Sequence, residues 1–564
     1  MNNNKFNADY IIIGAGSAGC ALAGRLLENT TASILMLEAG GKDSSFLIPL
    51  PAGFTKLMPT KNLIHFRTEP QSGLDGRPRI LPQGRVFGGG SSINAMVYIR
   101  GQAEDFNDWA AAGASGWSYQ DVLPYFMRAE DNERFDDEFH GTGGPLGVSD
   151  PRYLDTMTRA FVRAAQDAGH RYNQDFNGTT QEGVGFCQTT TRGMKRSSAA
   201  KAYLHSQLNN PRLKVLTGAA VTRILMKGDR AEGAEFVLNG QLMTAIAGQE
   251  VILSAGAIQT PKLLMLSGIG PESVLKSANV QVRHVLNGVG QNFQDHVEVP
   301  VIAFCRPGKP FGYYGQDKGL KMVKNALQYM MFGSGMVTAN VVEGHCFANS
   351  GTGASRADLQ MQFLPLVYLD LLDRGFIHKA GGTINTCVTR PFSRGEIRLR
   401  SSNPMDMPIV EPNYLQDQRD IDATLSGVSM AREIMASKAF SPYLGKEEMP
   451  GPAITSREDL HNYLRDYGKT VYHPAGTCRM GTDREAVVTP DLKVRGIEGL
   501  RVVDNSIMPT LTSGNTNAPA IMIGEKASDI IAGRKPLTSP ARIVDAGHGM
   551  TEHPQLRKQE EFVS

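Results

Sequence analysis

Three glycines near the start of the chain have the spacing of a phosphate-binding turn. Gly14, Gly16 and Gly19 follow an apolar run at residues 10–13, and Glu38 stands nineteen residues after the third glycine. Gly14 permits a tight turn, Gly16 lets the main chain approach a pyrophosphate, and Gly19 allows the next helix to pack closely. A carboxylate at position 38 can bind ribose hydroxyls. These residues predict a dinucleotide-binding site.

The elements around this motif predict an α/β domain. An apolar strand leads into the glycines, a helix follows them, and a second strand over residues 33–37 ends at the acidic residue. The free N–H groups at the start of the helix would face the phosphates. Later strands in "RLKVLTGAAVTRILM" and "QEVILSAGAIQTPKLLMLSGIG" would complete a parallel sheet. Gly88, Gly89 and Gly90 predict a loop whose backbone lies close to a ligand.

The composition excludes several classes of protein. A chain of 564 residues is too long for one compact core, and its net charge of +2 favours neither nucleic acid nor an anionic membrane as a partner. The six cysteines show no CxxC pair, so we expect reduced thiols, a cytoplasmic location and no metal site. We find no signal peptide and no stretch of about eighteen apolar residues that would span a membrane.

Four sequence blocks occur in an order typical of one enzyme family. They are "DYIIIGAGSAGCALAGRL", "GRVFGGGSSINAMVYIRG", "ILSAGAIQTPKLLMLSGIG", and the late pair "YHPAGTCRMG" with "NTNAPAIMIGEKASDII". From Asp9 to about Gly533 the chain resembles the glucose-methanol-choline (GMC) oxidoreductases, which use FAD. Within that family it is similar to bacterial FAD-dependent alcohol dehydrogenases such as sorbose dehydrogenase, through "HGTGGPLGVSD", "EPQSG" and "NVVEGHCF".

The resemblance implies a fold of two domains. One is a Rossmann-like FAD-binding domain with a parallel sheet, and the other is an α+β capping domain built on an antiparallel sheet. We expect the first domain to comprise residues 1–155, 205–300 and 470–535, the second to comprise 156–204 and 301–469, and residues 536–564 to form a polar tail.

The resemblance also implies which residues bind FAD. These are Gly14, Gly16, Ser17, Ala18, Gly19, Glu38, Ala39, Arg85, Gly88, Gly89, Ser91, Asn94, Ala95, Val97, Val221, Ala255, Asp504, Asn517 and Ala518. Without the resemblance, Asp504 reads almost equally well as a capping residue between a strand and a loop. The helix predicted over the block "NTNAPAIMIGEKASDII" would aim its positive end at the flavin, with its asparagines suited to capping.

His473 and Asn517 correspond to the catalytic pair of the family. An alcohol gives up hydride readily only as its hydroxyl proton leaves, and a neutral imidazole, with an ordinary pKa of about 6.5, can accept that proton. The turn "PAG" after His473 would hold the ring in place. Asn517 would present its amide to the same oxygen, so that hydride passes to flavin N5.

Two positions depart from the family pattern. Ile93 stands where some members carry a histidine bonded to FAD, so we expect the flavin to be bound non-covalently. Asn505 replaces a common alanine. The neighbouring Asn94 suits either a flavin contact or a plain turn.

Substrate residues are less clearly marked. Glu343 and His345 either reach the pocket or make interdomain contacts, and Tyr472 either walls the site or packs beside His473. A stripe of Met330, Met331, Phe332 and Met336 would form an apolar entrance or simply core. Peripheral docking of that patch on a membrane also stays open.

The predicted activity is FAD-dependent oxidation of a primary alcohol, sugar or polyol, with electrons passed to a quinone or an artificial dye. An oxidase that reduces O2, acting on choline or on aliphatic or aromatic alcohols, is the first alternative, because no motif separates the two. A lyase or a photodecarboxylase on the same scaffold is the second. The oligomeric state stays open.

Overall fold

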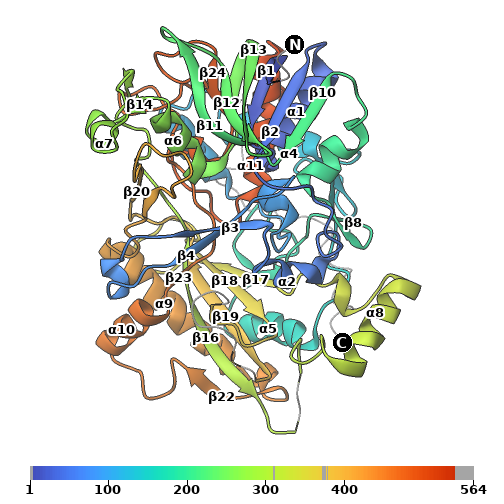
Figure 1. The fold of residues 1–564 in the computed structure, drawn as a ribbon. Helices are drawn as coiled ribbons and strands as arrows, with labels where there is room; N and C mark the ends of the chain where they lie inside the picture. The colour runs from blue at the N-terminus through green and yellow to red at the C-terminus, as the bar shows by residue number, and fades with distance from the viewer. Residues whose placement is uncertain (1–3, 309–310, 371–376, 378, 540–564) are drawn as a thin grey trace.

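The computed structural model describes residues 4–308, 311–370, 377 and 379–539, and it places two large sheets one above the other (Figure 1). The expected tail therefore lies outside the described residues from position 540 onward. Within the described residues, no helix combines the length and the apolar character needed to cross a membrane.

The upper sheet carries the glycine turn. In the described part of the chain it has seven strands in the order β10-β2-β1-β13-β12-β11, with β24 beside β13. Pairs that involve β1, β2, β10 and β24 are parallel, whereas β11, β12 and the first half of β13 are antiparallel. The strands are β1 (Lys5–Ile13), β2 (Ile34–Glu38), β10 (Leu213–Thr217), β11 (Ala220–Lys227), β12 (Arg230–Leu238), β13 (Gln241–Leu253) and β24 (Leu500–Val502).

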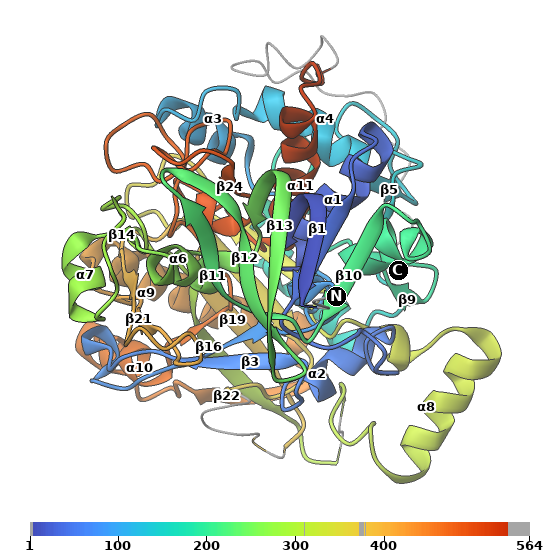
Figure 2. The ribbon, with the colours of Figure 1, turned by 45° about the horizontal axis from the view of Figure 1, so that its top comes forward.

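Helices pack closely against this sheet (Figures 1 and 2). α1 and α11 approach each other at Gly524, where a Cβ atom would lie 2.3 Å from the carbonyl oxygen of Ala18. The helices in this layer are α1 (Ser17–Asn29), α3 (Ala103–Ala111), α4 (Tyr119–Ala129), α6 (Gly256–Leu266), α7 (Glu272–Ser277) and α11 (Asn517–Ile531).

The lower sheet is antiparallel throughout its described pairs. Its order is β22-β16-β19-β18-β17-β7, with β23 beside β16. The strands are β7 (Gly183–Phe186), β16 (Val297–Cys305), β17 (Gly344–Ala348), β18 (Leu359–Leu364), β19 (Gly381–Val388), β22 (Leu444–Met449) and β23 (Lys469–Thr470). A second hydrophobic core joins the sheet to α5 (Thr156–Asp167), α9 (Gln418–Met435) and α10 (Arg457–Tyr467).

Short elements connect these layers. The small two-stranded ladders pair β3 (Leu63–Arg67) with β4 (Ile80–Gly84), β5 (Glu130–Asn132) with β6 (Leu146–Val148), β8 (Thr191–Arg192) with β9 (Lys195–Arg196), β14 (Ile269–Gly270) with β15 (His284–Val285), and β20 (Glu396–Arg398) with β21 (Ile409–Glu411). Ile397 and Val410, from the last of these, pack in the core of the upper sheet, although they fall inside the range expected for the capping domain.

Two helices lie near the lower right of Figure 1, namely the short α2 (Phe54–Leu57) and the longer α8 (Gly319–Phe332). No residue of α8 is buried, and Met330, Met331 and Phe332 are 78%, 64% and 72% exposed. Interpreting these three as core is therefore wrong. Met336, by contrast, lines the cavity described next.

Candidate active site

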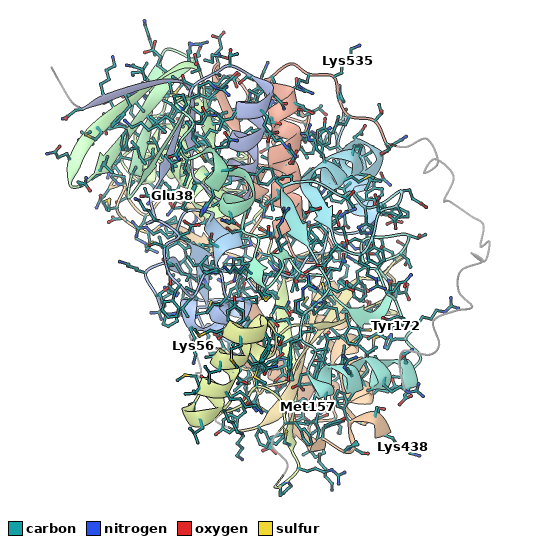
Figure 3. All side chains as sticks on the ribbon, turned by 90° about the vertical axis from the view of Figure 1, so that its right-hand side faces the viewer. Glu38, Lys56, Met157, Tyr172, Lys438 and Lys535 are labelled. Atoms are coloured by element: carbon teal, nitrogen blue, oxygen red, sulfur yellow. The ribbon has the colours of Figure 1, made fainter. Side chains whose placement is uncertain are left out.

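A cavity of about 950 Å³ is lined by residues from both large sheets. Its wall includes the glycine turn after β1, the end of β2, and the turn that holds His473. Figure 3 labels two of its lining residues, Glu38 in the upper part and Lys56 above α8. The cavity thus brings the predicted nucleotide motif and the predicted base to one space.

The glycine turn has the backbone that its sequence predicts. Gly14 has φ +103°, and a Cβ atom there would lie 2.3 Å from the carbonyl oxygen of Ser254. A Cβ atom on Gly19 would lie 2.3 Å from the carbonyl oxygen of Gly14. Gly16 is the N-cap residue of α1 and has no side chain with which to cap the helix. The first N–H groups of α1 are therefore left for a ligand at this end of the cavity.

A second glycine loop packs directly on the first. The Gly88 N–H donates to the Ala15 carbonyl over 2.8 Å, and a Cβ atom on Gly89 would lie 2.7 Å from the Gly16 Cα. The Ser91 hydroxyl donates to the Gly88 carbonyl over 2.6 Å and therefore supports the loop rather than lining the cavity. A residue with a side chain would therefore not fit at Gly89, where the two loops meet.

Glu38 ties the end of β2 to the glycine turn. Its Oε2 accepts from the Ala15 N–H over 2.9 Å, and its Oε1 accepts from the Gly40 N–H over 2.7 Å. The side chain lines the cavity, and burial raises the pKa of its carboxyl group. Each oxygen keeps a further lone pair with which to accept a ribose hydroxyl.

Asn94 is held by an arginine that the sequence analysis missed. The Arg196 guanidinium donates to Asn94 Oδ1 over 2.7 Å and to the Ser91 carbonyl over 3.1 Å. Burial lowers the pKa of Arg196 to about 9. Asn94 and its neighbour Ile93 both line the cavity. Nothing in the local sequence marks Arg196, because it lies about a hundred residues further along the chain.

The backbone around His473 is fixed by strain and by a buried acid. Tyr472 has φ +69°, a left-handed conformation that is uncommon for a residue with a side chain. The His473 N–H donates to Asp295 Oδ1 over 2.8 Å, and hydroxyl groups of Tyr414 and Thr470 donate to Oδ2. Burial raises the pKa of Asp295 to about 6.

The ring of His473 belongs to a chain of hydrogen bonds in which the donor and the acceptor of each bond can be assigned. His296 Nε2 lies 2.8 Å from the Thr389 carbonyl oxygen, which can only accept, so Nε2 carries the proton. His296 Nδ1 is then an acceptor for His473 Nδ1, at 2.9 Å. The remaining nitrogen, His473 Nε2, carries no proton, and its lone pair accepts from the Asn515 amide over 3.3 Å.

Both imidazoles are neutral. Burial lowers the pKa of His296 to about 4. Burial, together with the neighbouring His296, holds the pKa of His473 well below 6.5. His473 Nε2 is therefore a base ready to accept a proton at the cavity wall.

Asn515, rather than Asn517, makes the hydrogen bond to His473. Asn517 Oδ1 instead accepts from the Ser17 hydroxyl over 2.8 Å, which joins the starts of α11 and α1. Asn517 Nδ2 is buried and has no hydrogen-bond partner among the described residues. The asparagines do not cap α11, whose N-cap residue is Thr516 without a side-chain bond. An uncapped helix start with a free amide donor thus faces the cavity.

The three residues predicted to contact the substrate do not lie together at the cavity wall. Tyr472 lines the cavity, whereas Glu343 and His345 are fully buried behind its wall. Glu343 accepts from hydroxyl groups of Thr158 and Tyr313, and burial raises its pKa to about 7. His345 acts through a neighbour: the Gln360 amide lies 3.1 Å from its Nδ1 and donates to Asn515 Oδ1 over 3.3 Å.

Most of the residues predicted to bind FAD line the cavity. Those that do are Gly14, Gly16, Ser17, Ala18, Glu38, Ala39, Arg85, Gly89, Asn94, Ala95, Val97, Val221, Ala255, Asp504 and Asn517, whereas Gly19, Gly88, Ser91 and Ala518 lie just behind the wall. Asp504 also caps, because its Oδ2 accepts from the Gly256 N–H and its Oδ1 from the Ser506 N–H. Asp504 can therefore act both as a capping residue and as a residue of the predicted FAD site.

Comparison with known proteins decides the family. Residues 8–298 and 391–524 match the N-terminal and C-terminal parts of the GMC oxidoreductases. The chain belongs to the GMC oxidoreductase family. As a GMC oxidoreductase it is an FAD-dependent oxidoreductase, and its two-sheet architecture is the GMC fold.

Relatives of this GMC oxidoreductase span nearly its whole length. It is 42% identical over 550 residues to an alcohol dehydrogenase [acceptor] of Pseudomonas putida, covering 96% of this chain and 98% of the relative. It is 43% identical over 540 residues to the mitochondrial choline dehydrogenase of Homo sapiens, covering 94% and 90%. The solved structure of pyridoxine 4-oxidase from Mesorbium loti superposes with a TM-score of 0.85 at 29% identity, covering 94% and 100%.

The cavity of this GMC oxidoreductase fits FAD. Two glycine loops and the uncapped start of α1 suit the pyrophosphate, and Glu38 suits the ribose. The unpartnered Asn517 amide and the start of α11 suit the acceptor atoms of the flavin. Bound there, FAD would supply an acceptor for two electrons.

Proposed function

We propose that this enzyme oxidises a neutral primary alcohol to an aldehyde, with His473 Nε2 as the base that takes the hydroxyl proton. The observation that carries this proposal is the direction of the hydrogen bonds from Thr389 through His296 to His473. That direction leaves one basic nitrogen at the wall of the cavity that also holds the glycine turn. An alcohol would displace the Asn515 amide from His473 Nε2, and that amide would then donate to the alcohol oxygen, while Asn517 would contact the cofactor.

The far wall of the cavity supports an apolar substrate. On the side of the lower sheet, the lining includes the aliphatic residues Val337, Val341, Val342, Leu364 and Leu366, together with the polar residues Glu298, Gln362 and Asn385. Among the described residues, Gln362 Nε2 and Asn385 Oδ1 are buried polar atoms without a partner on the same side. Those two atoms could serve only two polar groups of a substrate, and the aliphatic residues beside them suit an aliphatic or aromatic body better than a sugar such as sorbose, whose several hydroxyl groups each need a partner.

One acidic residue at this wall could in principle bind the positive charge of choline. Glu298 lines the cavity, and Lys469 and Asn385 both donate to its Oε1. Burial alone would lower the pKa of Lys469, but Glu298 and Tyr368 raise it overall, so the ammonium group stays charged. Since the charge of Glu298 is already compensated, this residue offers no free carboxylate to a quaternary ammonium. This favours neutral alcohols over choline.

We further propose that FAD is bound non-covalently and that its electrons pass to a quinone or a dye rather than to O2. Ile93 lines the cavity with a side chain that has no nucleophilic atom. The Pseudomonas putida relative is named for an unspecified acceptor, which supports the choice of acceptor. Acid precipitation should therefore release the flavin into the supernatant, and a flavin that stays with the pellet would contradict this binding mode.

The activity is tested by titrating the purified, FAD-loaded protein without oxygen. Alkanols and benzyl alcohols should bleach the flavin band near ~450 nm, with slow recovery in air. Sorbose and choline should bleach it much less. Fast recovery in air would favour the oxidase, whereas no bleaching with any alcohol would refute alcohol oxidation and favour the lyase or photodecarboxylase.

A further inference from the structure

Helix α8 presents an unusual surface for a helix of a globular protein. Its exposed side chains include Leu320, Met330 and Phe332, which are 88%, 78% and 72% exposed. Figure 2 shows the helix standing out from the body of the molecule, away from both large sheets. Large apolar side chains gathered in this way mark an interaction site.

The apolar residues follow one face of the helix. Leu320, Val323, Leu327, Met330 and Met331 are separated by three, four, three and one positions, which is the spacing of a single helical stripe. Each of the five side chains is exposed. The stripe is therefore continuous along about three turns of helix.

A different face of α8 borders the cavity. Met322, Asn325 and Ala326 line it, and their spacing places them on the side away from the stripe. Residues 313–318, just before the helix, line the same cavity. The exposed stripe therefore lies on the outer side of a helix whose opposite face borders the cavity.

The charged residues beside this stripe indicate which kind of partner it binds. Lys318, Lys321 and Lys324 accompany it, α8 contains no Asp or Glu, and no ion pair holds these three lysines within the described residues. The nearest acid in sequence, Asp317, already pairs with Lys56 over 2.5 Å. A second copy related by a two-fold axis would set these lysines against one another, because such an interface matches each patch with itself.

We propose that α8 docks the enzyme on an anionic lipid bilayer, with the stripe in the interface and the lysines at the headgroups. An interfacial helix has this composition, namely a narrow apolar face with basic residues on its flank. Docking would set the part of the cavity that α8 borders close to the membrane surface. The inference that a lipid-soluble alcohol or quinone reaches the cavity from the membrane rests on the proposed function. The docking itself does not rest on it.

Flotation of the FAD-loaded protein with vesicles tests the docking. The protein should float with vesicles that contain phosphatidylglycerol and much less with vesicles of phosphatidylcholine alone. The double variant Leu320→Ser/Met330→Ser should weaken binding to the anionic vesicles by about tenfold or more, because two large apolar contacts are lost. Lys321→Gln/Lys324→Gln should weaken it too, and added salt should mimic that effect.

Matched controls separate docking from general damage. Leu242→Ser removes a similarly exposed leucine at the start of β13, far from α8, and should leave binding unchanged. All variants should keep their flavin and their rate with a soluble dye, since none of these residues lines the cavity. Because binding is scored without substrate, failure of alcohol oxidation would leave this result intact.

Three outcomes would overturn the proposal. The first is wild-type protein that binds neither kind of vesicle. The second is binding that the stripe variant leaves unchanged. The third is a dimer in solution that the stripe variant converts to a monomer, because the stripe would then be covered by a second copy.

Discussion

The basic atom of His473 is determined by a carbonyl two rings away. The Thr389 oxygen can only accept, so it fixes the proton on His296 Nε2 and, through His296 Nδ1, the proton on His473 Nδ1. A single peptide group thus sets which nitrogen of His473 would present its lone pair to the proposed substrate. His296 is in this sense a positioning residue.

The buried environment of His473 predicts an unusually wide pH range for flavin reduction. Its neutral form accepts the proton, and its pKa lies well below 6.5, so acidification through 6.5 leaves it unprotonated. The rate of anaerobic flavin reduction should therefore be the same at about pH 6.5 as at about pH 8. A rate that halves near pH 6.5 would show an ordinary imidazole and contradict the argument.

The ion pair of Lys469 and Glu298 predicts how substrate choice can be changed. Lys469→Met removes the compensating charge and leaves the buried carboxyl group of Glu298, whose pKa burial raises, at the cavity wall, where a bound quaternary ammonium would favour its ionised form. We expect the KM for choline to fall by about tenfold, the scale of one uncovered charge contact, while the KM for a neutral alcohol changes little.

The double variant Lys469→Met/Glu298→Gln provides the control. It removes both charges and should show no gain with choline. Thermal melting and flavin content would verify that each variant folds, because an unpaired buried charge is destabilising. An equal gain in the single and double variants would rule out the charge argument.

The helices that approach the cofactor site are held by one buried carboxylate. Glu525 of α11 is fully buried and accepts from Arg25 of α1, Arg128 of α4 and the Tyr203 hydroxyl. Since the starts of α1 and α11 both face the cavity, this contact couples helix packing to FAD binding. This coupling arises from the packing of the helices and not from any one residue that lines the cavity.

Loss of that carboxylate should destabilise the enzyme strongly. Glu525→Gln removes the buried counter-charge that Arg25 and Arg128 share and leaves them only Glu28 and Asp529, for which we expect a loss of about 3 kcal/mol in the free energy of unfolding. Glu28→Gln removes an exposed partner of the same Arg25 and should cost less than about 1 kcal/mol. Urea unfolding of the two variants checks this, and equal effects would contradict it.

The sequence predicts some elements well because local patterns specify them. The glycine turn, the apolar strands beside it and the helix over residues 517–531 each carry their own signal. The antiparallel half of the upper sheet was not predicted. Its signal is present as Asn239-Gly240 between β12 and β13, where both residues have positive φ, as a tight hairpin requires.

The site itself was predicted only in part because its contacts join distant segments. His473 and the glycines are recognisable by motif, but His296, Arg196 and Lys469 have no local signature. The choice between Asn515 and Asn517 depends on where α11 begins and how each amide points, which residue types alone do not specify. The exposure of α8 likewise depends on packing, since its apolar period also suits a core helix.

At the scale of the whole molecule, the proposed catalysis depends on two sheets that share one cavity. The upper sheet supplies the glycine turn and Glu38, whereas the lower sheet supplies the substrate wall and the segments that carry His296 and His473. Neither part is complete without the other. The proposed docking helix borders the same cavity.

The most direct measurement is the rate of flavin reduction by an alkanol in a stopped-flow instrument without oxygen, for wild type and His473→Ala. We predict that His473→Ala retains FAD but reduces it about 10²–10⁴-fold more slowly, as expected when a general base is removed. His461→Ala, on α10, serves as the control and should behave as wild type. A His473→Ala variant that keeps its flavin and reduces it at the wild-type rate would contradict the account.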